Sequence, residues 1–109
     1  MHLTSEKIQK ELKQVSLDLL AYQPKKVILF GSLARGDYHE ASDIDLVIIK
    51  ETDKRFLERI SDVLRYMNSS LPIEALVYTP SEWQQMIQTE NSFAQTVQNE
   101  GVVLYEQHE

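Results

Sequence analysis

The chain has 109 residues, with 11 lysines and arginines, 17 aspartates and glutamates, no cysteine and a formal net charge of −6. A chain of this length can bury one two-layer core, but it cannot also hold a separate domain that grips a large substrate. The lack of cysteine excludes disulfides, thiolate metal sites and cysteine nucleophiles. No apolar run reaches the length of a membrane span, and the first residues do not resemble a signal peptide. We therefore expect one domain over residues 1–109, located in the cytoplasm and not in a membrane.

The negative charge is concentrated in the second half of the sequence. Every lysine and arginine occurs at or before Arg65, whereas residues 66–109 contain six glutamates and no lysine or arginine. Because nucleic-acid binding relies on clustered basic side chains, we do not expect direct binding to a nucleic-acid duplex. An acidic half would suit a basic protein partner, although a solvated acidic surface would explain the same distribution.

The first part of the chain predicts one long helix followed by two buried strands. Apolar side chains at spacings of four, three and four residues predict a helix over about Thr4–Tyr22. Lys26–Phe30 is a short apolar run that stops at Gly31, as expected of a buried strand. A short helical stretch at residues 33–35 and a polar loop then lead to a second strand, Asp43–Ile49, which is rich in β-branched side chains.

A second helix, a third strand and a third helix are expected next. Residues 53–68 carry the apolar pattern of a helix, and Ile73–Tyr78 has the composition of a strand. Thr79 can then cap another helix, with Pro80 in its first turn and Glu82 at the third position, which is the pattern of a capping box. The apolar residues that mark the helix at 53–68 are Phe56, Leu57, Ile60, Val63, Leu64 and Met67.

The end of the chain predicts a short helix and an edge strand. Phe93 and Val97 indicate the helix, and Gly101 is expected just beyond its end. Val102–Tyr105 can add the edge strand. The order of elements predicts an α/β (α+β) fold, in which helices cover a small mixed β-sheet.

The turn after the first strand could bind phosphate. Gly31 would let the backbone approach an anion closely, Ser32 would supply a hydroxyl, and the amides of the next helical turn would add partial positive charge. The same residues also suit an ordinary turn. Neither a P-loop nor the Gly-x-Ser-x-Gly sequence of a nucleophile elbow is present.

Two aspartates in the second strand indicate a metal site. Because side chains alternate along a strand, Asp43 and Asp45 would point to one side while Ile44, Leu46 and Ile48 point into the core. Neighbouring carboxylates repel each other, and a cation between them removes the repulsion. Mg²⁺ is favoured because it takes oxygen ligands and binds through one or two carboxylates together with substrate phosphates. Solvated aspartates at the end of a strand are the alternative interpretation.

Glu74 is a third carboxylate that could join this pair. It shares a face of its strand with Leu76 and Tyr78, and a glutamate in an otherwise apolar strand needs a partner. If the third strand lies beside the second, Asp43, Asp45 and Glu74 would converge on one or two metal ions. Such an arrangement suits two-metal phosphoryl transfer, in which the third carboxylate can also help to accept a proton.

The motif as a whole resembles the nucleotidyltransferases related to polymerase β. The resemblance rests on Gly31-Ser32, ten intervening residues and then Asp43-Ile44-Asp45, followed by a carboxylate on a later strand. Within that superfamily, residues 30–36 and 42–46 are similar to the minimal nucleotidyltransferase (MNT) group. Glu74 stands where such domains commonly have aspartate.

The resemblance implies a role for each of these residues. It implies that Gly31, Ser32 and Arg35 bind the nucleotide, and that Asp43, Asp45 and Glu74 are catalytic and hold metal, with two Mg²⁺ ions and ATP as substrate. Arg35 could instead be a surface residue that pairs with a nearby acidic side chain, such as Asp37 or Glu40.

The resemblance also implies a partner. Minimal domains of this kind are similar to antitoxins paired with an all-helical HEPN-domain RNase toxin, in which the antitoxin transfers AMP from ATP to a tyrosine of the toxin. The domain could then form oligomers with itself or with the toxin. Three alternatives stay open: an antitoxin that only binds, a nucleotidyltransferase that modifies a small antibiotic-like alcohol, and a regulatory domain that only binds nucleotide.

Overall fold

The computed structural model describes residues 6–37 and 42–108. Its elements, in chain order, are α1 (Glu6–Leu20), β1 (Lys26–Phe30), α2 (Ser32–Arg35), β2 (Ile44–Ile49), α3 (Phe56–Leu64), β3 (Ile73–Tyr78), α4 (Pro80–Gln88), α5 (Ser92–Glu100) and β4 (Val102–Glu106). The order agrees with the sequence prediction, although α3 is shorter at both ends than expected. None of the helices in the described ranges has the length and apolar content that a membrane-spanning segment needs.

The strands form one mixed sheet in the order β3-β2-β1-β4. β1 lies antiparallel to both β2 and β4, whereas β2 and β3 are parallel. The parallel pair follows from the connection between them, because α3 carries the chain back to the end at which β2 began. The predicted α/β fold with a mixed sheet is confirmed.

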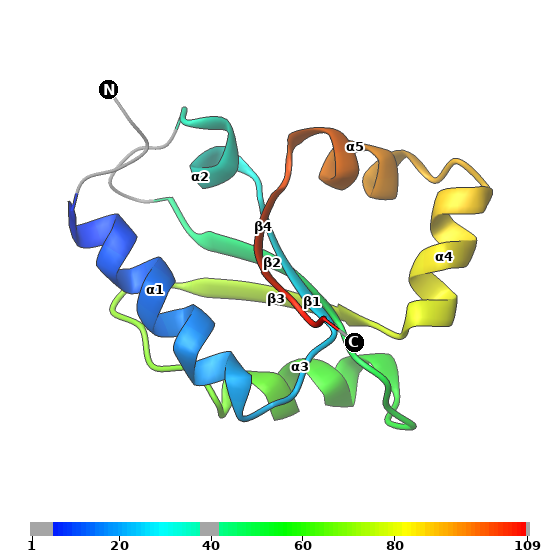
Figure 1. Cartoon of the computed structure of the whole chain (residues 1–109), viewed down its shortest axis with the longest axis horizontal. Helices are drawn as coiled ribbons and strands as arrows, with labels where there is room; N and C mark the ends of the chain where they lie inside the picture. The colour runs from blue at the N-terminus through cyan, green and yellow to red at the C-terminus, as the bar shows by residue number, and fades with distance from the viewer. Residues whose placement is uncertain (1–5, 38–41, 109) are drawn as a thin grey trace.

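Helices cover both faces of the sheet (Figure 1). α1 and α3 pack on one face, where they meet the side chains of Ile44, Leu46 and Ile48 in β2, as the sequence predicts. α4 and α5 pack on the other face against Val47 and Ile49. The structure therefore has three layers where chain length alone suggested two, because β2 is apolar on both of its faces and each face needs a cover.

The capping box at the start of α4 is confirmed. The Thr79 hydroxyl accepts a hydrogen bond from the Glu82 amide at 3.2 Å, and the Glu82 carboxylate accepts one from the Thr79 amide at 2.8 Å. These two bonds satisfy amides that the first turn of a helix leaves without an internal partner. They fix the point at which the chain leaves β3 and turns onto the sheet.

Arg59 is a buried residue that the apolar pattern of α3 does not predict. It is 7% exposed, whereas Leu57 in the same helix is 76% exposed. The guanidinium donates to the carbonyl oxygens of Lys54 at 2.8 Å and Val77 at 3.1 Å, and to both carboxylate oxygens of Glu82 at 2.7 and 3.2 Å. Arg59 thus ties α3 to the end of β3 and to the start of α4.

Replacing Arg59 tests this connection. Arg59→Met keeps the apolar stem but removes four hydrogen bonds, and we expect a loss of about 2–4 kcal/mol in the free energy of unfolding. The loss stays below that of a fully buried pair because the Glu82 side chain is 45% exposed. Urea unfolding measures the effect, with Arg65→Met as the control because Arg65 is exposed. Equal stability of the two variants would show that the Arg59 bonds contribute nothing net.

The predicted place of Gly101, directly after the end of α5, is confirmed. Gly101 has φ −72° and ψ 156°, which is extended backbone and not the left-handed region. Close packing accounts for the glycine instead, because a Cβ atom here would overlap the carbonyl oxygen of Val97 and lie 2.6 Å from Cγ2 of Ile28. The absence of a Cβ atom lets the end of α5 lie directly on β1.

Candidate active site

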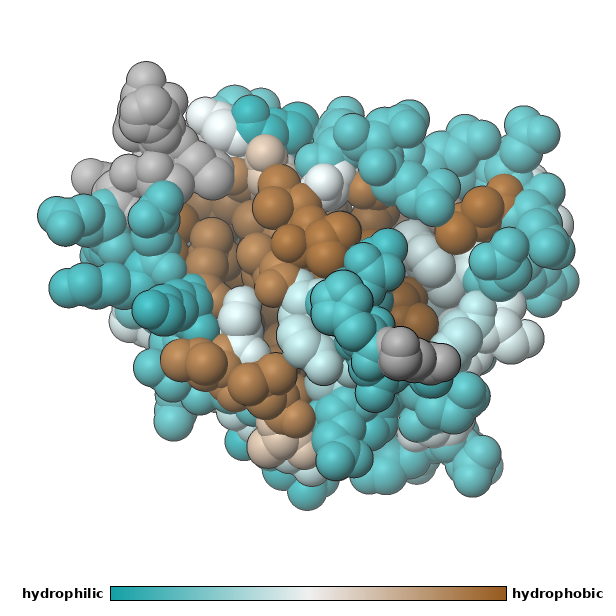
Figure 2. Space-filling view, viewed as in Figure 1, coloured by the Kyte–Doolittle hydropathy of each residue, from teal (hydrophilic) through white to brown (hydrophobic). Residues whose placement is uncertain are grey.

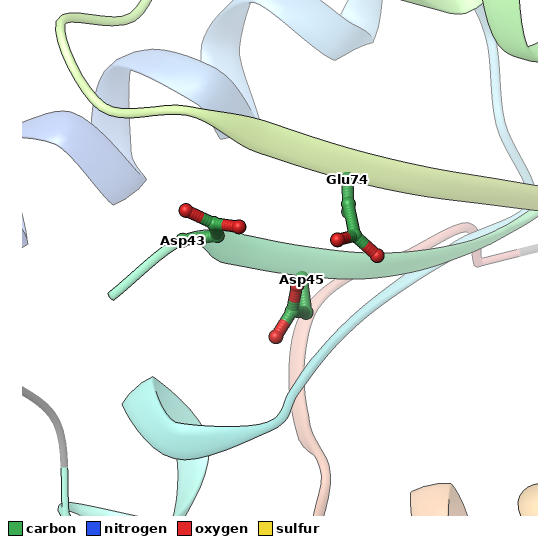
Figure 3. Close-up of side chains that lie close together, drawn as sticks. All are labelled: Asp43, Asp45 and Glu74. Carbon is green, nitrogen blue, oxygen red and sulfur yellow. The ribbon is translucent and has the colours of Figure 1, made fainter. Parts of the chain in front are cut away.

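The three carboxylates predicted from the sequence lie together at one end of the sheet. Asp45 is the direct partner of Glu74 in the parallel pairing of β2 with β3, and Asp43 precedes β2. One oxygen atom from each side chain lies within 4.8 Å of the others. Figure 3 shows Glu74 reaching from β3 across β2, while the carboxylate of Asp45 extends toward the turn that carries α2. The predicted convergence of Asp43, Asp45 and Glu74 is confirmed.

The carboxylates differ in their exposure. Asp43 and Asp45 are half-buried and Glu74 is exposed. Glu74 is not buried, although it stands in an otherwise apolar strand. It lies near the start of β3, whereas α4 follows the opposite end of that strand and covers the sheet from there. The cluster is consequently open to solvent on one side, where a substrate can approach.

The electrostatics of the cluster suit a cation. Burial raises the pKa of the Asp45 carboxyl above its usual range, the charges of Glu74 and Asp43 raise it further, and Arg35 partly opposes them. Three convergent carboxylates supply hard oxygen ligands, which is the donor set that Mg²⁺ prefers. Both the donor atoms and their mutual repulsion therefore fit a divalent metal ion.

The raised pKa of Asp45 predicts a pH dependence of the metal-free protein. A carboxyl with a higher pKa in the folded chain binds its proton more tightly there, so its contribution to stability falls as the pH rises from the ordinary aspartate pKa through the raised one. In EDTA, we expect the melting temperature of Asp45→Asn to rise relative to that of the wild type as the pH increases across this window. Thermal melts of both proteins at matched pH test this. A difference that does not vary with pH would contradict the described environment of Asp45.

Gly31 leaves room for the carboxylate of Asp45. Its backbone has φ +79° and ψ −158°, a region that only glycine occupies readily. A Cβ atom at this position would overlap a carboxylate oxygen of Asp45. The sequence prediction explained Gly31 by the approach of a phosphate, and the structure adds that the glycine makes room for Asp45.

Ser32 opens α2 beside the cluster, and its hydroxyl contacts a residue that the prediction did not single out. Ser32 Oγ donates to Ser42 Oγ at 3.1 Å. Ser42 is buried, with 7% of its surface exposed, and it directly precedes Asp43. The only signal for Ser42 in the sequence is its place next to the first aspartate of the motif.

Arg35 lies at the exposed end of α2. Its Nε atom pairs with Asp37 at 3.1 Å, as one of the two sequence interpretations expected, and its Nη1 atom approaches Glu100 of α5 at 3.6 Å. The hydrogen bond and the charge of Asp37 raise the pKa of Arg35. Glu40, the other expected partner, lies outside the described residues. The role of Arg35 at phosphate stays a prediction, while its charge already acts on Asp45.

The fold is that of the nucleotidyltransferases. A crystal structure from Sulfolobus solfataricus, described as a "putative nucleotidyltransferase", matches with a TM-score of 0.67 and covers 94% of this chain and 86% of its own. The two sequences are 21% identical, so this similarity concerns the fold alone.

Sequence similarity defines the family. The profile described as "Polymerase beta, Nucleotidyltransferase" matches residues 6–109, and the chain belongs to this family. It is a nucleotidyltransferase. Two proteins of Methanocaldococcus jannaschii, each named "Putative protein adenylyltransferase", are 35% and 41% identical to it. The first similarity covers 94% of this chain and all of the relative, and the second covers 87% of this chain and 93% of the relative.

Proposed function

We propose that the chain is a Mg²⁺-dependent protein adenylyltransferase that acts in the cytoplasm as the antitoxin of a HEPN/MNT pair. It would transfer AMP from ATP to a tyrosine of its partner RNase toxin. The observation that carries the proposal is the convergence of Asp43, Asp45 and Glu74 within 4.8 Å, beside the Gly31-Ser32 turn. The names of the two Methanocaldococcus relatives support a protein as the acceptor.

The residues of the site would divide the reaction between them. Gly31 and Ser32 hold the triphosphate, and the hydroxyl oxygen of the acceptor attacks the α-phosphorus of ATP. The bond from this phosphorus to the oxygen that bridges to the β-phosphate breaks, and pyrophosphate leaves. Glu74, which is exposed beside Asp45, accepts the proton of the hydroxyl. Mg²⁺ bound by the three carboxylates would supply neutralisation of phosphate charge and polarisation of the hydroxyl.

Ion pairs within the chain occupy part of the acidic second half. Three glutamates of the acidic half form ion pairs with basic residues of the first half. These pairs are Glu82 with Arg59, Glu100 with Arg35, and Glu106 with Lys26. Half of the six glutamates of residues 66–109 are therefore paired within the chain. This weakens the argument that the acidic half binds a basic partner through charge alone.

Exposed apolar side chains support docking more directly. Figure 2 shows apolar surface gathered over α1 and β4. On these elements Leu17, Leu20, Val102 and Val103 are between 43% and 52% exposed. Large apolar patches on a small protein commonly mark contact with another protein. We propose that the helical toxin docks over α1 and β4.

One experiment tests this function. The chain and a candidate partner, an all-helical protein of the HEPN type, are incubated with Mg²⁺ and with either α-labelled or γ-labelled ATP. We expect label in the partner from α-labelled ATP only, and mass spectrometry should find one added AMP on a tyrosine. A partner in which this tyrosine is replaced by phenylalanine is the control. Tight binding without label would favour an antitoxin that only binds, and neither binding nor label would favour a small-molecule nucleotidyltransferase.

A further inference from the structure

A side-chain hydrogen bond connects the two halves of the site. Ser32 lies in the turn after β1, and Ser42 lies just before Asp43, ten residues later in the chain. Their hydroxyl oxygens are 3.1 Å apart, with Ser32 as the donor. Ser42 is 7% exposed and Ser32 is half-buried, so Ser42 contacts Ser32 from the interior of the protein.

The chemistry of the two hydroxyls shows what this bond can do. A serine hydroxyl donates one hydrogen bond and accepts others, whereas a phosphate oxygen at neutral pH is an acceptor. When Ser32 donates to a phosphate, it can no longer donate to Ser42. The pair can then reverse its direction, so that Ser42 donates to Ser32 while Ser32 donates to the phosphate. The Ser32 oxygen then stays in one position while its proton turns from Ser42 to the phosphate.

The backbone fixes the local fold without this bond. β1 pairs with β2 up to Phe30 and Asp45, which sets the turn against the second strand. The Ser32–Ser42 bond is therefore available for positioning a side chain.

We propose that Ser42 is a positioning residue for the nucleotide: its hydroxyl holds the Ser32 oxygen in the position from which Ser32 can donate to the triphosphate. The inference rests on the proposed function, because it assumes that ATP binds at this site. It assigns to Ser42 no contact with the nucleotide. Removal of the Ser42 hydroxyl should then lower the affinity for ATP in a protein that has the Ser32 hydroxyl, and should have no effect in a protein that lacks it.

The test measures ATP affinity by titration calorimetry with Mg²⁺ and without an acceptor. We expect Ser42→Ala to bind ATP about three- to tenfold more weakly than the wild type, which corresponds to one net hydrogen bond. The double variant Ser32→Ala/Ser42→Ala should bind no more weakly than Ser32→Ala alone. Ser16→Ala is the matched control, because it removes a hydroxyl that donates to the Leu12 carbonyl at 2.9 Å on α1, and it should bind as the wild type does.

A second substitution separates positioning from folding. Ser42→Cys keeps the shape of the side chain, with a somewhat larger terminal atom, but replaces the hydroxyl with a weak hydrogen-bonding group, and it should lose affinity as Ser42→Ala does. Wild-type affinity in Ser42→Cys, or effects of Ser32→Ala and Ser42→Ala that simply add, would overturn the inference and leave the proposed function intact. A wild-type protein that binds no ATP would instead refute the proposed function.

Discussion

Asp43→Asn and Asp45→Asn should each lower nucleotidyl transfer about a thousandfold or more. Each change removes one negative charge from a cluster whose oxygens lie within 4.8 Å of one another. A loss of several kcal/mol of transition-state stabilisation corresponds to a fall of this size. Transfer from α-labelled ATP to the partner protein measures it. Asp53→Asn, which changes an exposed aspartate after β2, should keep wild-type transfer.

The same variants should fold as well as the wild type in the absence of metal. Asp45 faces Glu74 directly across the strand pair, and like charges in that position destabilise a sheet. The melting temperature of Asp45→Asn in EDTA should therefore be equal to or higher than that of the wild type. Transfer at the wild-type rate by either aspartate variant would refute the assignment of these residues.

Gly31→Ala should have the second largest effect, because it changes both the backbone and the carboxylate cluster. The conformation at φ +79° and ψ −158° costs a non-glycine residue about 1–3 kcal/mol. The new Cβ atom would also overlap the Asp45 carboxylate and displace it. Because a misplacement of about 1 Å at a reacting centre can cost about a hundredfold in rate, we expect transfer to fall by about that factor.

Gly36→Ala is the matched control for this prediction. Gly36 also has a positive φ, +86°, but a Cβ atom there would meet nothing within 4 Å. It should lower stability through backbone strain and leave transfer close to the wild-type rate. Equal losses of transfer in Gly31→Ala and Gly36→Ala would show that contact with Asp45 is not the reason for Gly31.

The sequence predicted those features that depend on local pattern. Alternation along a strand predicts that Asp43 and Asp45 point to one side, and their oxygens do lie close together, although Asp43 stands just before β2. The capping box of Thr79 and Glu82 spans only four residues, and it too was confirmed. Convergence with Glu74 needed one further assumption, that β2 and β3 are neighbours, and the sheet satisfies it.

Features that depend on distant contacts could not be predicted in this way. Arg59 interrupts the apolar pattern of α3 because its partner, Glu82, lies 23 residues later. Gly101 was correctly assigned to a helix end, but its close packing against Ile28 of β1 was not predicted. The acidic second half suggested a charged surface, but folding brings three of its six glutamates to basic residues of the first half.

Binding of Mn²⁺ tests most directly whether the three carboxylates form a metal site. Mn²⁺ takes the same oxygen ligands as Mg²⁺ and is visible by electron paramagnetic resonance. With a non-hydrolysable ATP analogue present, we predict saturable Mn²⁺ binding by the wild type and by Asp53→Asn. Asp43→Asn and Asp45→Asn should weaken Mn²⁺ binding more than the loss of a residue that only hydrogen-bonds to a metal ligand, which costs roughly 10- to 100-fold. Unchanged Mn²⁺ affinity in Asp45→Asn would contradict the metal site, and with it the proposed chemistry.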